Sequence, residues 1–295
     1  MNREIILQLI GQTPAGQWTE QNIHNNIHHK TRLNSFSDMS YKEIKSNFEN
    51  TFVDQLKAYN HSTLTGLEEF KHVDSIIGCT QYIDTLYQSQ PKNIYVLPNE
   101  YHYHHSLKMN NIIEPEALPD NGHVLMSVPN FNNAGLPEHF EKVLNVATQR
   151  NCSVHLDLAW WTISRGLTLD LRSPCIKTVA TSLGKPFSIL KNRIGIRLRK
   201  SEVTDAVTVQ NGMNNIPESL FKIGLSYLQQ HSLGYMWDTY GESYDELCRT
   251  AKLRPTPIYF IAGLFGQGNK HINLALKEFY ANWCARHDSN MRPSV

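Results

Sequence analysis

Short apolar runs, several of them separated by stretches with helical spacing, organise the middle of the chain. The runs are rich in valine and isoleucine, a composition typical of buried strands. They lie at residues 73–77, 94–97, 124–128, 154–158, 176–180 and 194–198. Strands that alternate with helices predict an α/β fold with a mostly parallel sheet covered by helices.

Amphipathic periodicity predicts helices on both sides of these runs. Residues 41–57 repeat apolar side chains at helical spacing. A second helix follows Gly135, with Pro137 in its first turn, and ends near Arg150. Beyond the sheet we predict helices at 217–230, 244–253 and 271–286 and one strand at 258–262.

The order of these elements predicts two domains, because no repeat or low-complexity linker marks a boundary. Residues 60–200 form the large α/β domain in this interpretation. A smaller α+β domain is built from both termini, residues 1–59 and 201–295.

Charge and cysteine content indicate which partners, metal sites and cellular compartment to expect for this protein. The 28 lysines and arginines nearly balance the 27 acidic residues, so we expect no nucleic-acid partner. The five cysteines are scattered and form no C-x-x-C pair, which favours reduced thiols in the cytoplasm and no structural zinc site. The longest apolar run, residues 258–265, is too short to span a membrane, so we expect no membrane segment.

Polar and small residues gather at the ends of the predicted strands, where open α/β sheets bind ligands. They occupy residues 78–80, 132–135, 157–160 and 182–185, with Arg193 further on. Together they offer a lysine amine, a carboxylate, an amide and backbone N–H groups beside an arginine. This combination suits a phosphorylated pyridine aldehyde.

Each of these residues has a chemical role in that interpretation. Lys185 forms the imine, since a lysine that is desolvated or beside other cations loses its proton readily. Asp157 faces the pyridine nitrogen and keeps it protonated, so that the ring withdraws electrons from Cα. Asn132 donates to the ring hydroxyl.

The phosphate is expected at a helix start. Cys79 and Thr80 follow a predicted strand and begin a helix, so their N–H groups and the helix dipole favour an anion. The Ser182 hydroxyl and the Arg193 guanidinium complete this phosphate site.

The same segments resemble motifs of the fold type I pyridoxal-phosphate enzymes, and among them the class I/II aminotransferase family. Asn132-Asn133-Ala134-Gly135 resembles the family's Asn-Pro-Thr-Gly turn, and Asp157-Leu158-Ala159-Trp160 resembles Asp-x-Ala-Tyr. Ser182-Leu183-Gly184-Lys185 is similar to Ser-x-Ser-Lys, and Arg193-Ile194-Gly195 to Arg-x-Gly. The order of the motifs makes the resemblance specific, although each is short.

Two tyrosines extend the resemblance, which covers residues 59–200. Tyr59 resembles the tyrosine that reaches the phosphate of the neighbouring subunit, and Tyr101 the aromatic residue that stacks on the pyridine ring. The resemblance implies a seven-stranded, mostly parallel sheet and a homodimer with active sites at the interface. It also implies pyridoxal 5'-phosphate as the cofactor and an amine or amino acid as the substrate.

The sequence departs from the family at three points. Trp160 replaces the tyrosine of Asp-x-Ala-Tyr, and the proline of Asn-Pro-Thr-Gly is missing. Residues 290–295 resemble the segment before the family's carboxylate-binding arginine, and the sequence stops before that arginine. Arg254, Arg286 or Arg292 is left as a candidate for that role.

Simpler interpretations exist for the same residues. Ser182-x-x-Lys185 also occurs in penicillin-binding enzymes, but Pro186 and the strand-like approach do not suit the helix required there. Asp157 is otherwise a cap, Arg193 a surface ion-pair partner and Asn132 a turn former. Several histidines cluster without joining cysteines or carboxylates at ligand spacing, so we expect no metal site; they are His24, His28, His29, His102, His104 and His105.

We therefore predict a pyridoxal-phosphate enzyme, an aminotransferase that acts through a Lys185 Schiff base. A decarboxylase, lyase or cyclase with the same cofactor is the alternative, since a fold does not fix the reaction. A non-catalytic subunit or regulator that retains the fold is the third hypothesis.

Overall fold

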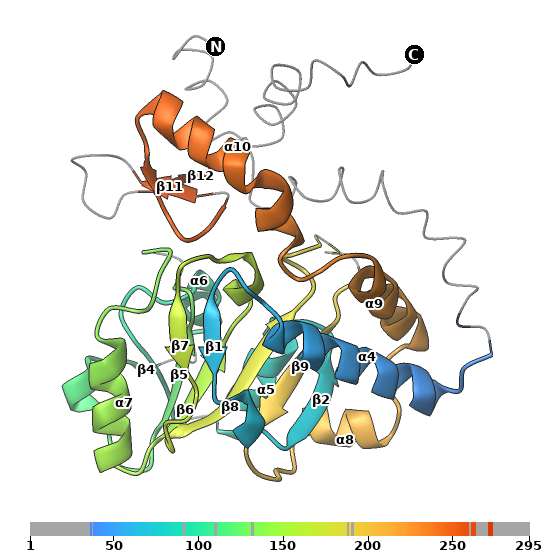
Figure 1. Cartoon of the computed structure of the whole chain (residues 1–295). Coiled ribbons are helices and arrows are strands. Elements are labelled where there is room, and N and C mark those ends of the chain that lie inside the picture. The colour runs from blue at the N-terminus through green and yellow to red at the C-terminus, as the bar shows by residue number, and fades with distance from the viewer. Residues whose placement is uncertain are drawn as a thin grey trace.

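A seven-stranded sheet forms the centre of the computed structural model (Figure 1), which describes residues 36, 38–90, 93–108, 111–130, 133–187, 189, 192–259, 261–263 and 271–273. The strand order is β2-β9-β8-β6-β5-β3-β4. β9 runs antiparallel to β2 and β8, and all other neighbouring strands in this sheet are parallel. This confirms the prediction of a mostly parallel sheet. The strands are β2 (His72–Ile76), β3 (Ile94–Val96), β4 (Asn111–Ile112), β5 (His123–Ser127), β6 (Ser153–Asp157), β8 (Ile176–Ser182) and β9 (Gly195–Arg199).

Helices cover both faces of this sheet, so its strands are apolar on both sides. In β5, Leu125 packs into one core, whereas Val124 and Met126 pack into the other. The Leu125 face is covered by α5 (Cys79–Ser89), α6 (His102–Leu107) and α8 (Ala206–Gly212). The opposite face is covered by α4 (Tyr41–Lys57), α7 (Phe140–Gln149) and α9 (Glu218–Gln230).

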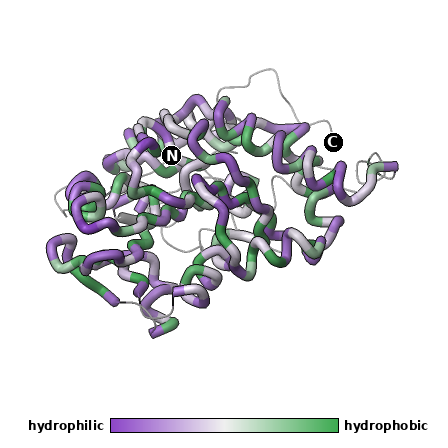
Figure 2. Tube along the Cα trace, turned by 90° about the horizontal axis from the view of Figure 1, so that it is seen from below, coloured by the Kyte–Doolittle hydropathy of each residue, from purple (hydrophilic) through white to green (hydrophobic). Residues whose placement is uncertain are grey.

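The predicted helix at 41–57 is confirmed as α4. Ser40 and Glu43 form a capping box at its start, and one apolar side is buried. Phe48 on that side packs on Phe221 of α9, with ring centroids 5.7 Å apart. Gly224 of α9 makes this approach possible, because a Cβ there would lie 2.6 Å from the Phe48 ring. In Figure 2, hydrophilic and hydrophobic residues alternate along the helices, as one buried side per helix requires.

The predictions for residues 244–286 need correction. Helix α10 (Tyr235–Ala251) begins before the predicted residue 244, because Trp237 and Tyr240 extend its buried side. Three antiparallel strands follow: β10 (Arg254–Pro255), β11 (Ile261–Gly263) and β12 (His271–Asn273). The helix predicted from His271 is therefore wrong at its start, since β12 pairs with β11 and local periodicity does not reveal such pairing. Residues 274–286 lie outside the described part.

Buried charges fasten the edge strand β2 to β9 and α8. Asp74 of β2 accepts hydrogen bonds from Arg197 and Arg199 of β9 at 3.0 and 2.6 Å. Arg197 also bonds Asp205, the N-cap of α8. Because these charges lie in the interior, each needs its partner, and loss of one would leave the others uncompensated.

Smaller elements complete the described chain. β1 (Thr63–Thr65) pairs with β7 (Thr168–Asp170) in a separate two-stranded sheet. Short 3-10 helices lie at Leu67–Glu69, Pro115–Ala117 and Trp161–Ile163. None of the helices in the described ranges is long and apolar enough to cross a membrane. The division into a 60–200 domain and a smaller one stays a prediction.

Candidate active site

A cavity of about 280 Å³ lies at the carboxyl ends of β6 and β8, beside the start of α5. Its walls come from segments that are far apart in the sequence. Seven of the nine predicted cofactor residues line it: Cys79, Thr80, Tyr101, Asp157, Ser182, Lys185 and Arg193. Tyr59 does not line it, and Asn132 lies outside the described residues.

One end of the cavity is the start of α5. Gly78, the N-cap, has φ 91°, a conformation that glycine adopts without strain. The first N–H groups of a helix have no acceptor within it, so those of Cys79 and Thr80 can bind an anion. Arg193 packs on Gly78, where an added Cβ would lie 3.5 Å from its side chain.

The Arg193 turn is held close to the end of β8. Gly195, which begins β9, pairs with Ser182. An added Cβ at Gly195 would lie 2.3 Å from the Thr181 carbonyl oxygen. Only a residue without a side chain fits there, so the glycine of Arg-x-Gly brings Arg193 to the same end of the cavity as Ser182.

Asp157 and Lys185 occupy the interior of the cavity. Asp157 ends β6, and its Oδ1 accepts a hydrogen bond from the Ala159 N–H at 2.9 Å. Burial raises the pKa of this carboxyl, although the Ala159 N–H, the Cys79 thiol and the Lys185 charge oppose the shift. The carboxylate is thus poised to accept one more donor.

The Lys185 amine is placed to lose its proton. Burial lowers the pKa of Lys185, and the positive charge of Arg193 lowers it further. Its Nζ lies 5.6 Å from the centroid of the Trp160 ring. An amine that deprotonates readily is a nucleophile for a carbonyl carbon.

Cys79 contributes a side chain as well as its backbone. Burial, followed by the charge of Asp157, raises the pKa of the thiol well above its usual value. The thiol therefore stays neutral and can donate to the Asp157 carboxylate. It is a hydrogen-bond partner here rather than a nucleophile.

Tyr101 forms a further wall. It is the N-cap of α6, its side chain is exposed, and its ring stacks on Tyr103 with centroids 6.0 Å apart. Trp160, which lies where the family has a tyrosine, also lines the cavity. The cavity thus has aromatic rings beside its charged groups.

Tyr59 lies apart from this cavity. It is buried within its own chain, where its hydroxyl donates to the Ser164 carbonyl oxygen, and it lines a different hollow near α9 and α10. Its predicted reach into a neighbouring subunit stays a prediction. Arg254 lies in β10 against Gly263 and does not line the cavity, and Arg286 and Arg292 lie outside the described residues.

The other sequence interpretations can be compared with the structure. Ser182 ends a strand, whereas the Ser-x-x-Lys motif of penicillin-binding enzymes requires a helix. The described residues contain no group of three or more side chains that could hold a metal ion. His24, His28 and His29 lie outside those residues, and His104 bonds the Tyr87 hydroxyl.

The sequence did not indicate Glu100. This carboxylate is only 4% exposed, and it accepts hydrogen bonds from the backbone of Ser127 and Tyr101 and from the amide of Asn130. Ser127 and Tyr101 line the cavity described above. In the sequence, only its position next to Tyr101 could have pointed to Glu100. Its burial depends on partners near the end of another strand, which the sequence pattern does not show.

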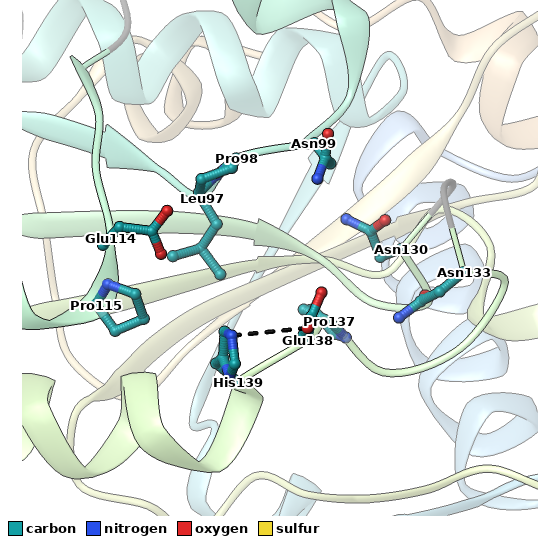
Figure 3. A pocket seen from close by; sticks show the side chains of 10 residues that line it. All are labelled: Leu97, Pro98, Asn99, Glu114, Pro115, Asn130, Asn133, Pro137, Glu138 and His139. Carbon is teal, nitrogen blue, oxygen red and sulfur yellow. Dashed lines mark ion pairs between the residues drawn. The ribbon is translucent and has the colours of Figure 1, made fainter. Parts of the chain in front are cut away.

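A second cavity, of about 410 Å³, lies beyond Asn130 (Figure 3). Glu114 and Asn130 lie on opposite sides of it, and His139 forms an ion pair with Glu138 at 3.8 Å. Because Asn130 also bonds Glu100, the Glu100 carboxylate connects the walls of both cavities.

Comparisons with known proteins identify the fold. No protein-family model matches the sequence, and no curated protein sequence matches it either. Many solved structures do match. A Thermus thermophilus aspartate aminotransferase double mutant is 13% identical, with 88% of this chain and 87% of that chain covered and a TM-score of 0.59.

Two other matches carry different descriptions. A PLP-bound putative aminotransferase from Clostridium difficile 630 is 12% identical over 94% of this chain and 89% of its own, with a TM-score of 0.61. A PLP-bound C-S lyase from Staphylococcus hominis is 11% identical over 93% and 91%, with a TM-score of 0.57. At these identities the similarity establishes the fold, which is that of the fold type I enzymes predicted from the sequence.

Proposed function

We propose that this protein is a pyridoxal-phosphate-dependent enzyme that acts on an amine or amino acid, and that the reaction is transamination. The observation that carries the proposal is the single cavity that combines Lys185, Asp157, the start of α5 and Arg193. Each of these groups suits a different part of one cofactor. The solved structures that share the fold include aminotransferases, among them PLP-bound ones.

The residues present fit the cofactor at both of its ends. The start of α5, Arg193 and Ser182 together provide N–H, guanidinium and hydroxyl donors for a phosphate. Asp157, buried and with acceptor capacity left, suits a protonated ring nitrogen. When bound, pyridoxal phosphate supplies an electron sink for a carbanion at the substrate Cα.

The chain itself contributes the covalent anchor and the proton transfers. Lys185 would hold the cofactor covalently through its Nζ, with loss of water, and as a free amine the same Nζ would take the proton from the substrate Cα. The lowered pKa of Lys185 favours both roles, because each needs the neutral amine. Asp157 holds the ring nitrogen in its charged form throughout. Tyr101 and Trp160 contribute aromatic walls to the cavity.

The experiment is an absorbance spectrum of the protein purified with pyridoxal phosphate, followed by borohydride reduction and peptide mapping. We expect a band near ~420 nm and a covalent adduct on Lys185. The Lys185→Ala variant should lose both. Lys177→Ala is the matched control, because Lys177 is an exposed residue of β8, the strand that ends just before Lys185. An adduct on another lysine, or none, would refute the proposal.

A lyase is the second candidate, since the C-S lyase matches this chain about as well as the aminotransferases do. The two reactions leave the cofactor in different forms. Transamination with an amino acid alone converts it to its amine, whereas a lyase returns it to the aldehyde. Product analysis after a single turnover with an amino-acid panel separates them. A protein that binds the cofactor but turns over no amine would support the non-catalytic alternative.

A further inference from the structure

Glu100 is a buried carboxylate in the loop between β3 and α6. Its Oε1 accepts from the Ser127 N–H at 3.1 Å and from Asn130 Nδ2 at 3.2 Å. Its Oε2 accepts from the Tyr101 N–H at 3.1 Å. Three donors from three places in the chain therefore converge on one side chain.

These partners stabilise the ionised form of Glu100. All three are N–H groups, and a carboxylate accepts at both oxygens. Hydrogen bonds to a charged acceptor are stronger than those to a neutral one, so protonation of Glu100 weakens all three bonds. An amide would in addition place a donor of its own against one of the N–H groups, and a buried donor without an acceptor is costly.

We infer that Glu100 is a positioning residue of the cofactor site, whose carboxylate holds Tyr101 in the wall of the cavity and whose protonation weakens this hold. The inference rests on the proposed function, because it assigns Tyr101 to the cofactor ring. Glu100 touches neither cofactor nor substrate in this role. It acts through the Tyr101 backbone and through the Ser127 strand end.

Three titratable neighbours of Glu100 on α5 and α6, Tyr87, Tyr103 and His104, keep one charge state near neutral pH. Burial raises the pKa of Glu100 to about 7. On α5, burial and then the charge of Glu100 raise the pKa of Tyr87 to about 12. On α6, a hydrogen bond to Asp84 raises the pKa of Tyr103 to about 12, and burial lowers that of His104 to about 4.

The remaining neighbours do not alter this conclusion. Ser127 of β5 and Asn130 of the following turn carry no titratable group. Glu114 and His139 line the second cavity, and both are solvent-exposed. The strength of the hydrogen bond from the Tyr101 N–H to Glu100 thus depends on whether Glu100 carries a proton.

The test compares the wild type with Glu100→Gln, both loaded with pyridoxal phosphate, from about pH 5 to about pH 9. The readouts are the visible circular dichroism of the bound cofactor, which reports its orientation, and its dissociation constant. In the wild type we expect a change in the dichroism with a midpoint near pH 7, as the Glu100 pKa requires. Glu100→Gln should lack this change and bind about tenfold more weakly at the alkaline end.

Two controls make the result specific. Glu114→Gln removes an exposed carboxylate beside the second cavity and should keep the wild-type midpoint. In a Tyr101→Ala background, Glu100→Gln should add less than about twofold to the loss of affinity, because the two residues act as one.

Each outcome decides the inference. A Glu100→Gln protein with the wild-type midpoint and affinity overturns it, while a Lys185 adduct in the same sample leaves the proposed function standing. A wild type without that adduct overturns the proposed function instead. Should Glu100→Gln fail to fold, Asn130→Ala removes one donor to the carboxylate and must move the midpoint upward; an unchanged midpoint contradicts the inference.

Discussion

Single residues decide the chemistry of the cavity, because burial sets their charge. Asp157 and Glu100 are both buried carboxylates with raised pKa values, yet their partners differ. Glu100 accepts from three N–H groups of the protein, whereas Asp157 accepts from the Ala159 N–H and the Cys79 thiol and lines the cavity. We therefore propose that Asp157 contacts the cofactor, whereas Glu100 holds other residues of the cavity in place.

Asp157→Asn tests the first assignment. An asparagine keeps an oxygen for the Ala159 N–H, so the strand end should persist. The negative charge that holds the ring nitrogen protonated is lost, and we expect turnover of any substrate amine to fall at least about 100-fold. The Lys185 adduct should survive in this variant. Turnover within about threefold of the wild type would exclude the assigned role.

Glu100→Gln should also change how stability depends on pH. The folded-state pKa of Glu100 is about 7 against an ordinary value of 4.5, so between these values the folded protein binds more protons than the unfolded chain. Glu100 thus stabilises the fold below pH 4.5, and this contribution is lost as pH rises through 7. From these pKa values we expect a loss of about 3 kcal/mol in the free energy of unfolding, absent in the variant. Urea unfolding of both proteins below pH 4.5 and above pH 7 measures this loss. An equal change of the free energy of unfolding with pH in the wild type and the variant would contradict the assignment.

At the scale of elements, the local hydrophobic pattern was sufficient to predict helices and strands whose buried side chains recur at regular spacing. α4 begins and ends where its apolar repeat predicts, and the six strands predicted between residues 73 and 198 all lie in the central sheet. Local pattern failed where partners are distant. β12 depends on β11, and the burial of Glu100 depends on Ser127 and Asn130, neither of which is visible from periodicity.

The contact between α4 and α9 gives a prediction at this scale. Gly224→Ala places a methyl group against Phe48, where the space is 2.6 Å, so we expect a loss of about 1–3 kcal/mol in the free energy of unfolding. Gly241→Ala in α10 is the control, because its Cβ meets Trp237 at an ordinary 3.5 Å. That change should be neutral or stabilise by up to about 1 kcal/mol. Thermal unfolding compares the two, and equal midpoints would show that α4 adjusts at no cost.

At the scale of the whole molecule, the candidate site is a joint product of distant segments. The short motifs were visible in the sequence, and the fold brings seven of the predicted residues to one cavity, whereas Tyr59 lies apart from it. Asn132 lies outside those residues, so its role stays a prediction. The cytoplasmic location also stays a prediction.

We predict that the protein is a homodimer, as the resemblance to the aminotransferase family implies. Tyr59 belongs to this prediction, since its own chain keeps it away from the cavity. Sedimentation equilibrium of the cofactor-loaded protein should give twice the mass of the 33.9 kDa chain. A monomer at all concentrations would leave Tyr59 with the structural bond to Ser164 alone.

The position of β2 at the sheet edge has a consequence for biosynthesis. In the central sheet β2 pairs with β9, which the ribosome makes only after β3 to β8. Gly78 follows β2 and Arg193 precedes β9, so one late pairing event both completes the sheet and brings Arg193 to the start of α5. A nascent chain that stops short of β9 exposes an unpaired strand edge and has no anion site to occupy. We therefore expect the cofactor to bind only after β9 has paired with β2.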